Sequence, residues 1–232
     1  MTTYTDGAAT AGAPRQLTDT RDMNLVHAIF RREYRLMPGL IRAVGSGDVQ
    51  RARVVGEHAQ MFITTLEHHH TNEDAMLWPK LHERVPTELE PLVDLMEDHH
   101  AQVHDLMEAI EPLLGRWISS ADVRDRDHLA DLFDRLYAIL VEHLGAEERD
   151  LLPIMARTIT AAEWTEFVEA GHAAIPGSRR FMALGAMLYD GDPDFMAIKL
   201  REIPAPMRPV IVWLALRAFR RYARRIHRTS TP

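Results

Sequence analysis

The sequence contains no cysteine in its 232 residues. Disulfide bonds, thiolate zinc sites, iron–sulfur clusters and cysteine nucleophiles are therefore excluded, and any metal must be bound through nitrogen and oxygen. The chain also lacks an apolar run of the roughly 18 residues that a membrane-spanning helix needs. Residues 1–18 show neither the basic segment nor the apolar segment of a signal peptide. We therefore expect a cytoplasmic protein with a disordered N-terminal leader over residues 1–18.

Signals for β-strands are nearly absent, whereas apolar residues recur at helical spacing through most of the chain. With 46% hydrophobic and 26% charged residues, the composition is typical of a globular protein. The formal net charge of −7 gives no reason to expect nucleic acid as a partner. The sequence therefore predicts an all-α fold.

Four long helices are expected first, over residues 20–44, 48–84, 87–115 and 122–157. Thr87 and Glu90 have the spacing of a capping box at the start of the third helix. Because short links between long helices favour antiparallel neighbours, residues 19–157 are predicted to form an up-down-up-down four-helix bundle.

Residues 158–232 are expected to form a helical extension of the bundle. It would begin with a helix over 161–174, capped by Thr160 and Glu163, and chain breaks near 175–177, 190–193 and 203–206 would follow. Its last helix, over 207–228, carries seven arginines and no acidic residue. Such a helix suits contact with a membrane surface or an acidic protein. We favour packing of its apolar half on the bundle or across a homodimer, because the apolar run is too short to span a bilayer.

The thirteen histidines follow an internal repeat. His69 and Glu73 precede Pro79 at the same spacing with which His143 and Glu147 precede Pro153. Two further histidines stand at nearly equal distances before these pairs, His27 before His69 and His100 before His143. Each half of the bundle would thus contribute one histidine from its first helix and a His-x-x-x-Glu pair from its second.

Residues four apart lie on one face of a helix, so each His-x-x-x-Glu pair aims an imidazole and a carboxylate at one point. Both pairs continue an apolar stripe and are expected to face the core. A buried carboxylate is costly unless a cation neutralises it. His27, together with the pair His100 and His104, adds three imidazoles. Nitrogen and oxygen ligands suit iron, manganese or zinc, and seven of them suit two ions about 3.5–4 Å apart.

This pattern resembles the hemerythrin family, also described as the HHE cation-binding domain. The family has a lone histidine, then His-x-x-x-Glu, then His-x-x-x-His, then a histidine followed by a carboxylate. The order is matched by His27, His69 with Glu73, His100 with His104, and His143 with Glu147.

The resemblance implies two iron ions joined by an oxo or hydroxo bridge and by Glu73 and Glu147. One iron would be held by His100, His104 and His143, and the other by His27 and His69. The second iron would keep an open position for dioxygen, or for peroxide or nitric oxide. Glu148 is an alternative to Glu147, and His99 to His100, whereas His70 with Asp74 lies about 100° off the core stripe. The other histidines are interpreted as surface residues or as neighbours of the ligands: His58, His68, His70, His82, His99, His128, His172 and His227.

Reversible dioxygen binding, for sensing, storage or delivery, is the leading functional hypothesis. The alternatives are a diiron enzyme that consumes hydrogen peroxide or nitric oxide, and a regulatory module that responds to iron or oxygen. The sequence does not decide whether the protein is an enzyme.

Overall fold

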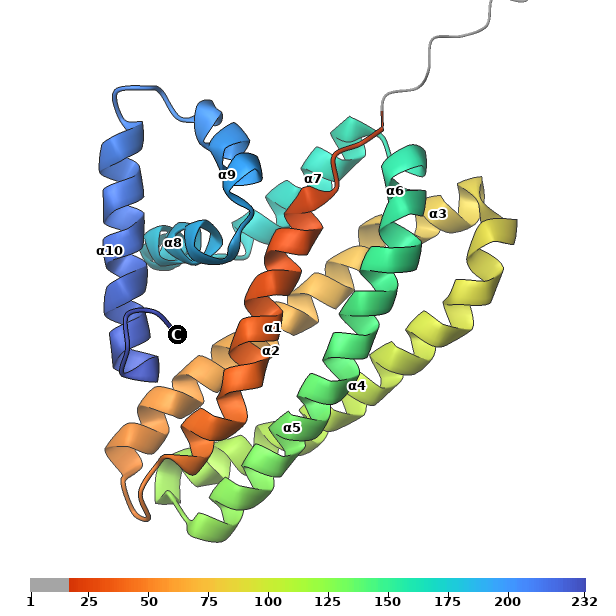
Figure 1. The fold of residues 1–232 in the computed structure, drawn as a ribbon. Coiled ribbons are helices and arrows are strands. Elements are labelled where there is room, and N and C mark those ends of the chain that lie inside the picture. Colours follow the sequence, from red (N-terminus) through yellow and green to blue (C-terminus); the bar gives the residue numbers. More distant parts are fainter. Residues whose placement is uncertain (1–16) are drawn as a thin grey trace, which may run out of the picture.

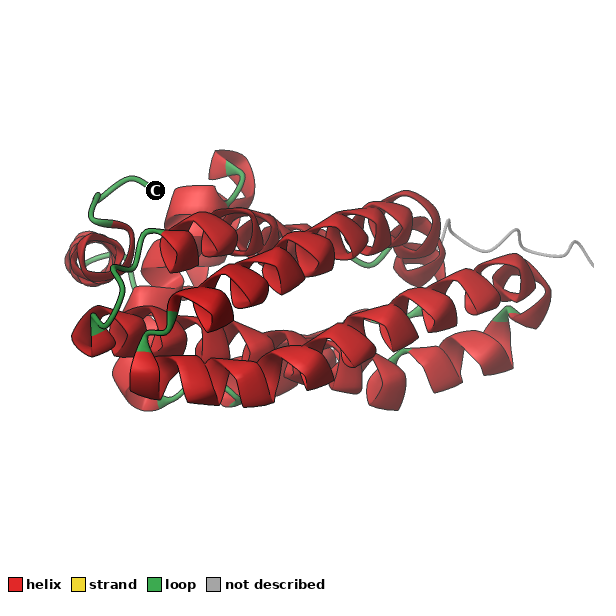
Figure 2. Cartoon of the chain, turned by 90° about the horizontal axis from the view of Figure 1, so that it is seen from below, coloured by secondary structure: helices red, strands yellow, loops and turns green. Residues whose placement is uncertain are grey.

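The structure is a computed structural model that describes residues 17–232, and it is all-helical over that range (Figure 2). Four long helices lie side by side in one bundle (Figure 1): α1 (Arg21–Arg42), α2 (Val49–Met76), α4 (Pro86–Ser120) and α5 (Val123–Ala146). The prediction of an all-α fold is confirmed. No helix within residues 17–232 is both long and apolar enough to cross a membrane.

One apolar core is shared by the four long helices, because each presents a stripe of buried side chains to the others. Representative buried residues are Phe30, Ile63, Ile110 and Phe133, one from each helix. The core fills the bundle toward the end where α1 turns into α2. Away from that end the same stripes carry polar residues, and the candidate site lies there.

The starts of the helices follow their local sequence. Asp48 accepts a hydrogen bond from the Arg51 amide and caps α2, and Asp122 caps α5 in the same way. The capping box expected at Thr87 was wrong, because α4 begins earlier, at Pro86, with no side-chain cap. Proline at the first helical position has the required φ and needs no amide partner. The helix also continues past its expected end at Gly115.

Both His-x-x-x-Glu segments are followed by a change in the helix. The helix α2 is interrupted at Leu77, and the short α3 (Trp78–Arg84) that follows carries Pro79 in its first turn. After α5 a π-helical turn, η1 (Glu147–Leu151), leads into α6 (Leu152–Thr158). Proline cannot donate to the carbonyl four residues earlier, which weakens the regular helix ahead of it. Single π-helical turns are frequent at functional sites, and this one begins at Glu147.

The C-terminal extension begins with α7 (Ala161–Ala173), and the predicted capping box of Thr160 and Glu163 is confirmed. The remaining elements are η2 (Gly177–Arg179), α8 (Arg180–Asp190), α9 (Pro193–Lys199), η3 (Leu200–Glu202) and α10 (Arg208–His227). One face of α10 packs against α8 beside the bundle (Figure 1), and it buries Phe219 and Ala223. Trp213, on another face of the helix, is exposed.

The approach of α8 to α10 is close enough to require glycine at position 185. A Cβ atom there would lie 2.2 Å from the carbonyl oxygen of Ala215 and 2.6 Å from the Cβ of Phe219. Gly185→Ala is therefore expected to lower the free energy of unfolding by about 1–3 kcal/mol, measured by urea unfolding. Gly171→Ala is the matched control, since a Cβ at Gly171 meets no atom within 4 Å. Equal stability of the two variants would contradict the close packing of α8 on α10.

Candidate metal centre

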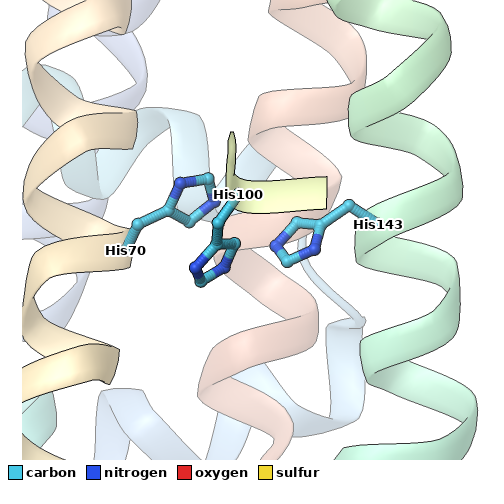
Figure 3. A group of neighbouring side chains, drawn as sticks. All are labelled: His70, His100 and His143. Atoms are coloured by element: carbon cyan, nitrogen blue, oxygen red, sulfur yellow. The ribbon is translucent and has the colours of Figure 1, made fainter. Parts of the chain in front are cut away.

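Two adjoining clusters of metal-ligand side chains lie inside the bundle. The carboxylate cluster consists of His27 from α1, His69 and Glu73 from α2, and Glu147 from η1. The three-histidine cluster consists of His70 from α2, His100 from α4 and His143 from α5 (Figure 3). In each cluster the ligand atoms lie within 4.8 Å of one another. The bundle therefore gathers five imidazoles and two carboxylates from its four long helices and the turn that follows α5.

The carboxylate cluster is shielded from solvent and tightly spaced. The Nε2 atom of His27 lies 3.3 Å from the Nε2 of His69 and 3.4 Å from the Oε2 of Glu147. The Nε2 of His69 lies 3.2 Å from the Oε1 of Glu73. None of these side chains is more than 8% exposed. Four possible metal-ligand atoms thus surround one small volume that is shielded from solvent.

The three-histidine cluster is built from rings that face one another. The rings of His70 and His100 stack with centroids 4.5 Å apart, and the ring of His143 stands 5.0 Å from the first and 4.9 Å from the second. Figure 3 shows the three rings converging from three helices. The two clusters meet where the Nε2 of His143 lies 3.9 Å from the Oε2 of Glu147.

Several buried polar atoms of these clusters have no hydrogen-bond partner. They are the Oε1 of Glu73, the Oε2 of Glu147, the Nε2 of His70 and both ring nitrogens of His143. Buried polar atoms are nearly always paired, and a cation bound among these atoms would pair them. Imidazole nitrogen and carboxylate oxygen are ligands that iron, manganese and zinc accept. The residues present therefore fit a metal centre.

The electrostatics of the clusters agree with this interpretation. Burial, together with repulsion from Glu147, raises the pKa of Glu73 well above its usual range, and burial also raises the pKa of Glu147. Two such carboxylates cannot both be charged here unless a cation replaces the proton. Burial and the neighbouring histidines lower the pKa values of His69 and His70. These imidazoles are therefore neutral, and each has a lone pair available for a metal.

Glu148 lies behind His27 rather than inside either cluster. Its Oε1 is 2.9 Å from the Nδ1 of His27, and both of its oxygens accept hydrogen bonds from Arg31, at 2.7 and 2.9 Å. Burial alone would raise the pKa of Glu148, but His27 and Arg31 lower it to about 2. A carboxylate held on the second nitrogen of a histidine orients the ring and fixes its tautomer. Sequence reasoning considered Glu148 only as an alternative ligand and missed Arg31, which lies one helical turn after His27.

His104 is the one predicted ligand that the structure leaves out of both clusters. Its side chain is 68% exposed and lies 3.4 Å from Glu108. The buried stripe of α4 passes through Met96, His99 and Val103, and a residue directly after Val103 is turned about 100° away from it. The expectation that His104 faces the core needs correction for this reason.

The third histidine beside His100 and His143 is His70, where sequence reasoning expected His104. His70 was interpreted as a surface or neighbouring residue, yet its side chain is buried and its ring contacts both His100 and His143. A signal was available, because Leu66, His70 and Glu73 continue the alternating three- and four-residue spacing of the α2 core stripe. His99 is also buried, and its ring centroid lies 5.8 Å from that of His143, but it belongs to neither cluster.

The neutral state of His143 predicts how the metal-free protein responds to acid. Burial, followed by repulsion from His100 and His27, lowers its pKa from 6.5 to about 3. Between these values the unfolded chain binds more protons, so the free energy of unfolding should fall as pH falls. The slope from this residue is at most about 1.4 kcal/mol per pH unit. His143→Gln should flatten the decline, measured by urea unfolding in the presence of a chelator. Identical slopes would show that His143 is not held neutral.

A bundle of four long helices that buries imidazole nitrogens and carboxylate oxygens without hydrogen-bond partners has the ligand set of a metal-binding helical bundle. The sequence model of the family described as Hemerythrin HHE cation binding domain matches residues 18–165. The chain therefore belongs to the hemerythrin family, and the matched segment contains every residue of both clusters. No curated protein and no solved structure gives a significant match.

Proposed function

We propose that the protein is a non-heme diiron protein that binds dioxygen reversibly. The observation that carries the proposal is the asymmetry of the site, with three imidazoles in one cluster and two imidazoles with two carboxylates in the other. The match to a cation-binding family supports a metal centre, and the nitrogen and oxygen donors suit iron. The chain also reverses direction at each link of the bundle (Figure 1), which supports an up-down-up-down topology of the hemerythrin type.

The two clusters support one assignment of the ligands. One iron would be held by His70, His100 and His143, and the other by His27 and His69. Glu73 and Glu147 would bridge the ions, because both carboxylates belong to the second cluster and Glu147 also approaches His143. This assignment differs from the sequence-based one only in placing His70 where His104 was expected. Bound iron would supply an open coordination position at the ion with fewer imidazoles.

The protein around the site favours binding over oxygenation. Five imidazoles and only two carboxylates leave little negative charge to stabilise highly oxidised iron. The ring of Phe30 packs against His69, with centroids 5.3 Å apart, and helps to exclude water from the carboxylate cluster. A pocket of about 150 Å³ borders His100 and Trp78, beside the three-histidine cluster.

Stopped-flow absorbance tests this function. Reduced, iron-loaded protein is mixed with oxygenated buffer, and the oxygen is then removed by purging with argon. Reversible binding predicts an absorbance band that appears on mixing, disappears on purging and returns on a second exposure. Continuous loss of added hydrogen peroxide or nitric oxide, with no reversible band, would contradict the proposal and favour an enzyme.

A further inference from the structure

A third group of buried ligand-type side chains lies outside both clusters, where the end of α10 meets the bundle. Glu33 comes from α1, His58 from α2 and His227 from the last residue of α10. The Oε2 of Glu33 is 3.1 Å from the Nε2 of His58 and 3.1 Å from the Nε2 of His227. Along α2, His58 stands about 16 Å from His69, which makes this a separate site.

The three facing atoms have no hydrogen-bond partner. The Oε2 of Glu33 and the Nε2 atoms of His58 and His227 are buried and unpaired, and the side chains are 2%, 0% and 4% exposed. The carboxylate oxygen and the two ring nitrogens lie at ion-pair distance, so all three atoms share one small space.

Hydrogen bonds from outside the group hold two of these side chains in position. The Nδ1 of His58 lies 2.8 Å from the hydroxyl of Tyr222, so its Nε2 is turned toward Glu33. The other oxygen of Glu33 accepts hydrogen bonds from Arg32 at 3.1 and 2.7 Å, and Arg32 in turn pairs with Asp190. Ligand residues of metal sites characteristically have such outer partners, because these set the tautomer and the direction of the lone pair.

Hydrogen bonds hold the end of α10 against α2, where His227 lies beside Glu33 and His58. Arg51 of α2 donates hydrogen bonds to the carbonyl oxygens of Arg225 and Ile226, in the last turn of α10. A cavity of about 360 Å³ borders His58, Tyr222 and Ile226 next to this group.

We propose that Glu33, His58 and His227 form a mononuclear site for a zinc ion. Two imidazoles and one carboxylate with a free coordination position are a known ligand set for zinc. Because the ligands come from α1, α2 and α10, the bound ion fastens the C-terminal helix to the bundle. The site is independent of the proposed diiron centre and adds a third metal ion to the chain.

Zinc titration of the iron-loaded protein tests the proposal. Isothermal titration calorimetry, with metal content measured by mass spectrometry, is expected to show one zinc ion bound per chain and no loss of iron. His227→Ala should weaken zinc binding more than about tenfold, and Tyr222→Phe, which keeps the ring, should weaken it about 10–100-fold. His172→Ala, a change at an exposed histidine of α7, should bind zinc like the unmodified protein.

The proposal is overturned if iron-loaded protein binds no zinc, or if His227→Ala and Tyr222→Phe both bind it as tightly as the unmodified chain. Repeating the titration in Glu147→Gln separates the two sites. A His227-dependent zinc ion that persists while iron is lost supports the third site, whatever the outcome for the diiron centre.

Discussion

Glu147→Gln is expected to reduce the iron content from about two ions per chain to one or fewer. The amide keeps the size of the side chain, but it replaces one oxygen by a donor nitrogen and cannot bridge two cations. The same change should stabilise the metal-free protein at pH 7. Burial raises the pKa of Glu147, so the carboxyl group costs stability as pH rises through that pKa, and the amide has no such cost. Iron analysis and urea unfolding with and without a chelator measure the two effects.

Glu148→Gln is the matched control for this prediction. Glu148 contacts His27 and Arg31 from outside the clusters, so its loss should weaken iron binding about 10–100-fold without removing a ligand. At saturating iron the Glu148 variant should therefore reach the full iron content, whereas the Glu147 variant should not. The opposite order would mean that Glu148 is the bridging residue.

His70→Ala is expected to weaken iron binding by more than about tenfold and to leave the ion held by His100 and His143 incompletely coordinated. The side chain is buried in the three-histidine cluster, and its ring stacks on His100. Metal content after dialysis against a graded series of chelator concentrations measures the loss. The thermal transition of the iron-loaded protein should also fall, because less metal-binding free energy supports the folded state.

His104→Ala provides the contrast, because His104 is an exposed histidine one helical turn after His100. It is expected to leave the iron content, the absorbance spectrum and the thermal transition unchanged. If this variant lost iron while His70→Ala retained it, α4 would have to be rotated, and the sequence-based assignment of His104 would be restored.

The start of a helix was predicted correctly where the sequence carried only one start signal. Thr160 and Glu163 form the capping box that their spacing indicated. Thr87 and Glu90 have the same spacing, but α4 starts one residue before Thr87, at Pro86, and has no side-chain cap. A capping motif is therefore informative only when no stronger start signal stands beside it.

Sequence reasoning found the residues of the clusters where the internal repeat and the apolar core stripe pointed to the same positions. They agree for His27, His69, Glu73, His143 and Glu147, and all five lie in or between the two clusters. They disagree on α4, where the buried residues follow a different phase from the His-x-x-x-His motif. A motif gives the spacing of two residues along a helix, whereas the packing of the whole helix decides which of them faces inward.

The meeting of Glu33, His58 and His227 had no signal in the sequence. Glu33, His58 and His227 come together only because α10 folds back along α8 and ends against α2. No spacing rule relates residues so far apart in the chain. A structure was needed to find this group, and the position of α10 depends in turn on close packing at Gly185.

An anomalous difference map, recorded at the iron absorption edge from crystals of the iron-loaded protein, tests the central claim most directly. The account predicts two iron peaks about 3.5 Å apart, one beside His70, His100 and His143 and the other beside His27 and His69. Glu73 and Glu147 should lie between the peaks. A single peak inside the bundle, or an iron bound by His104 in place of His70, would contradict it.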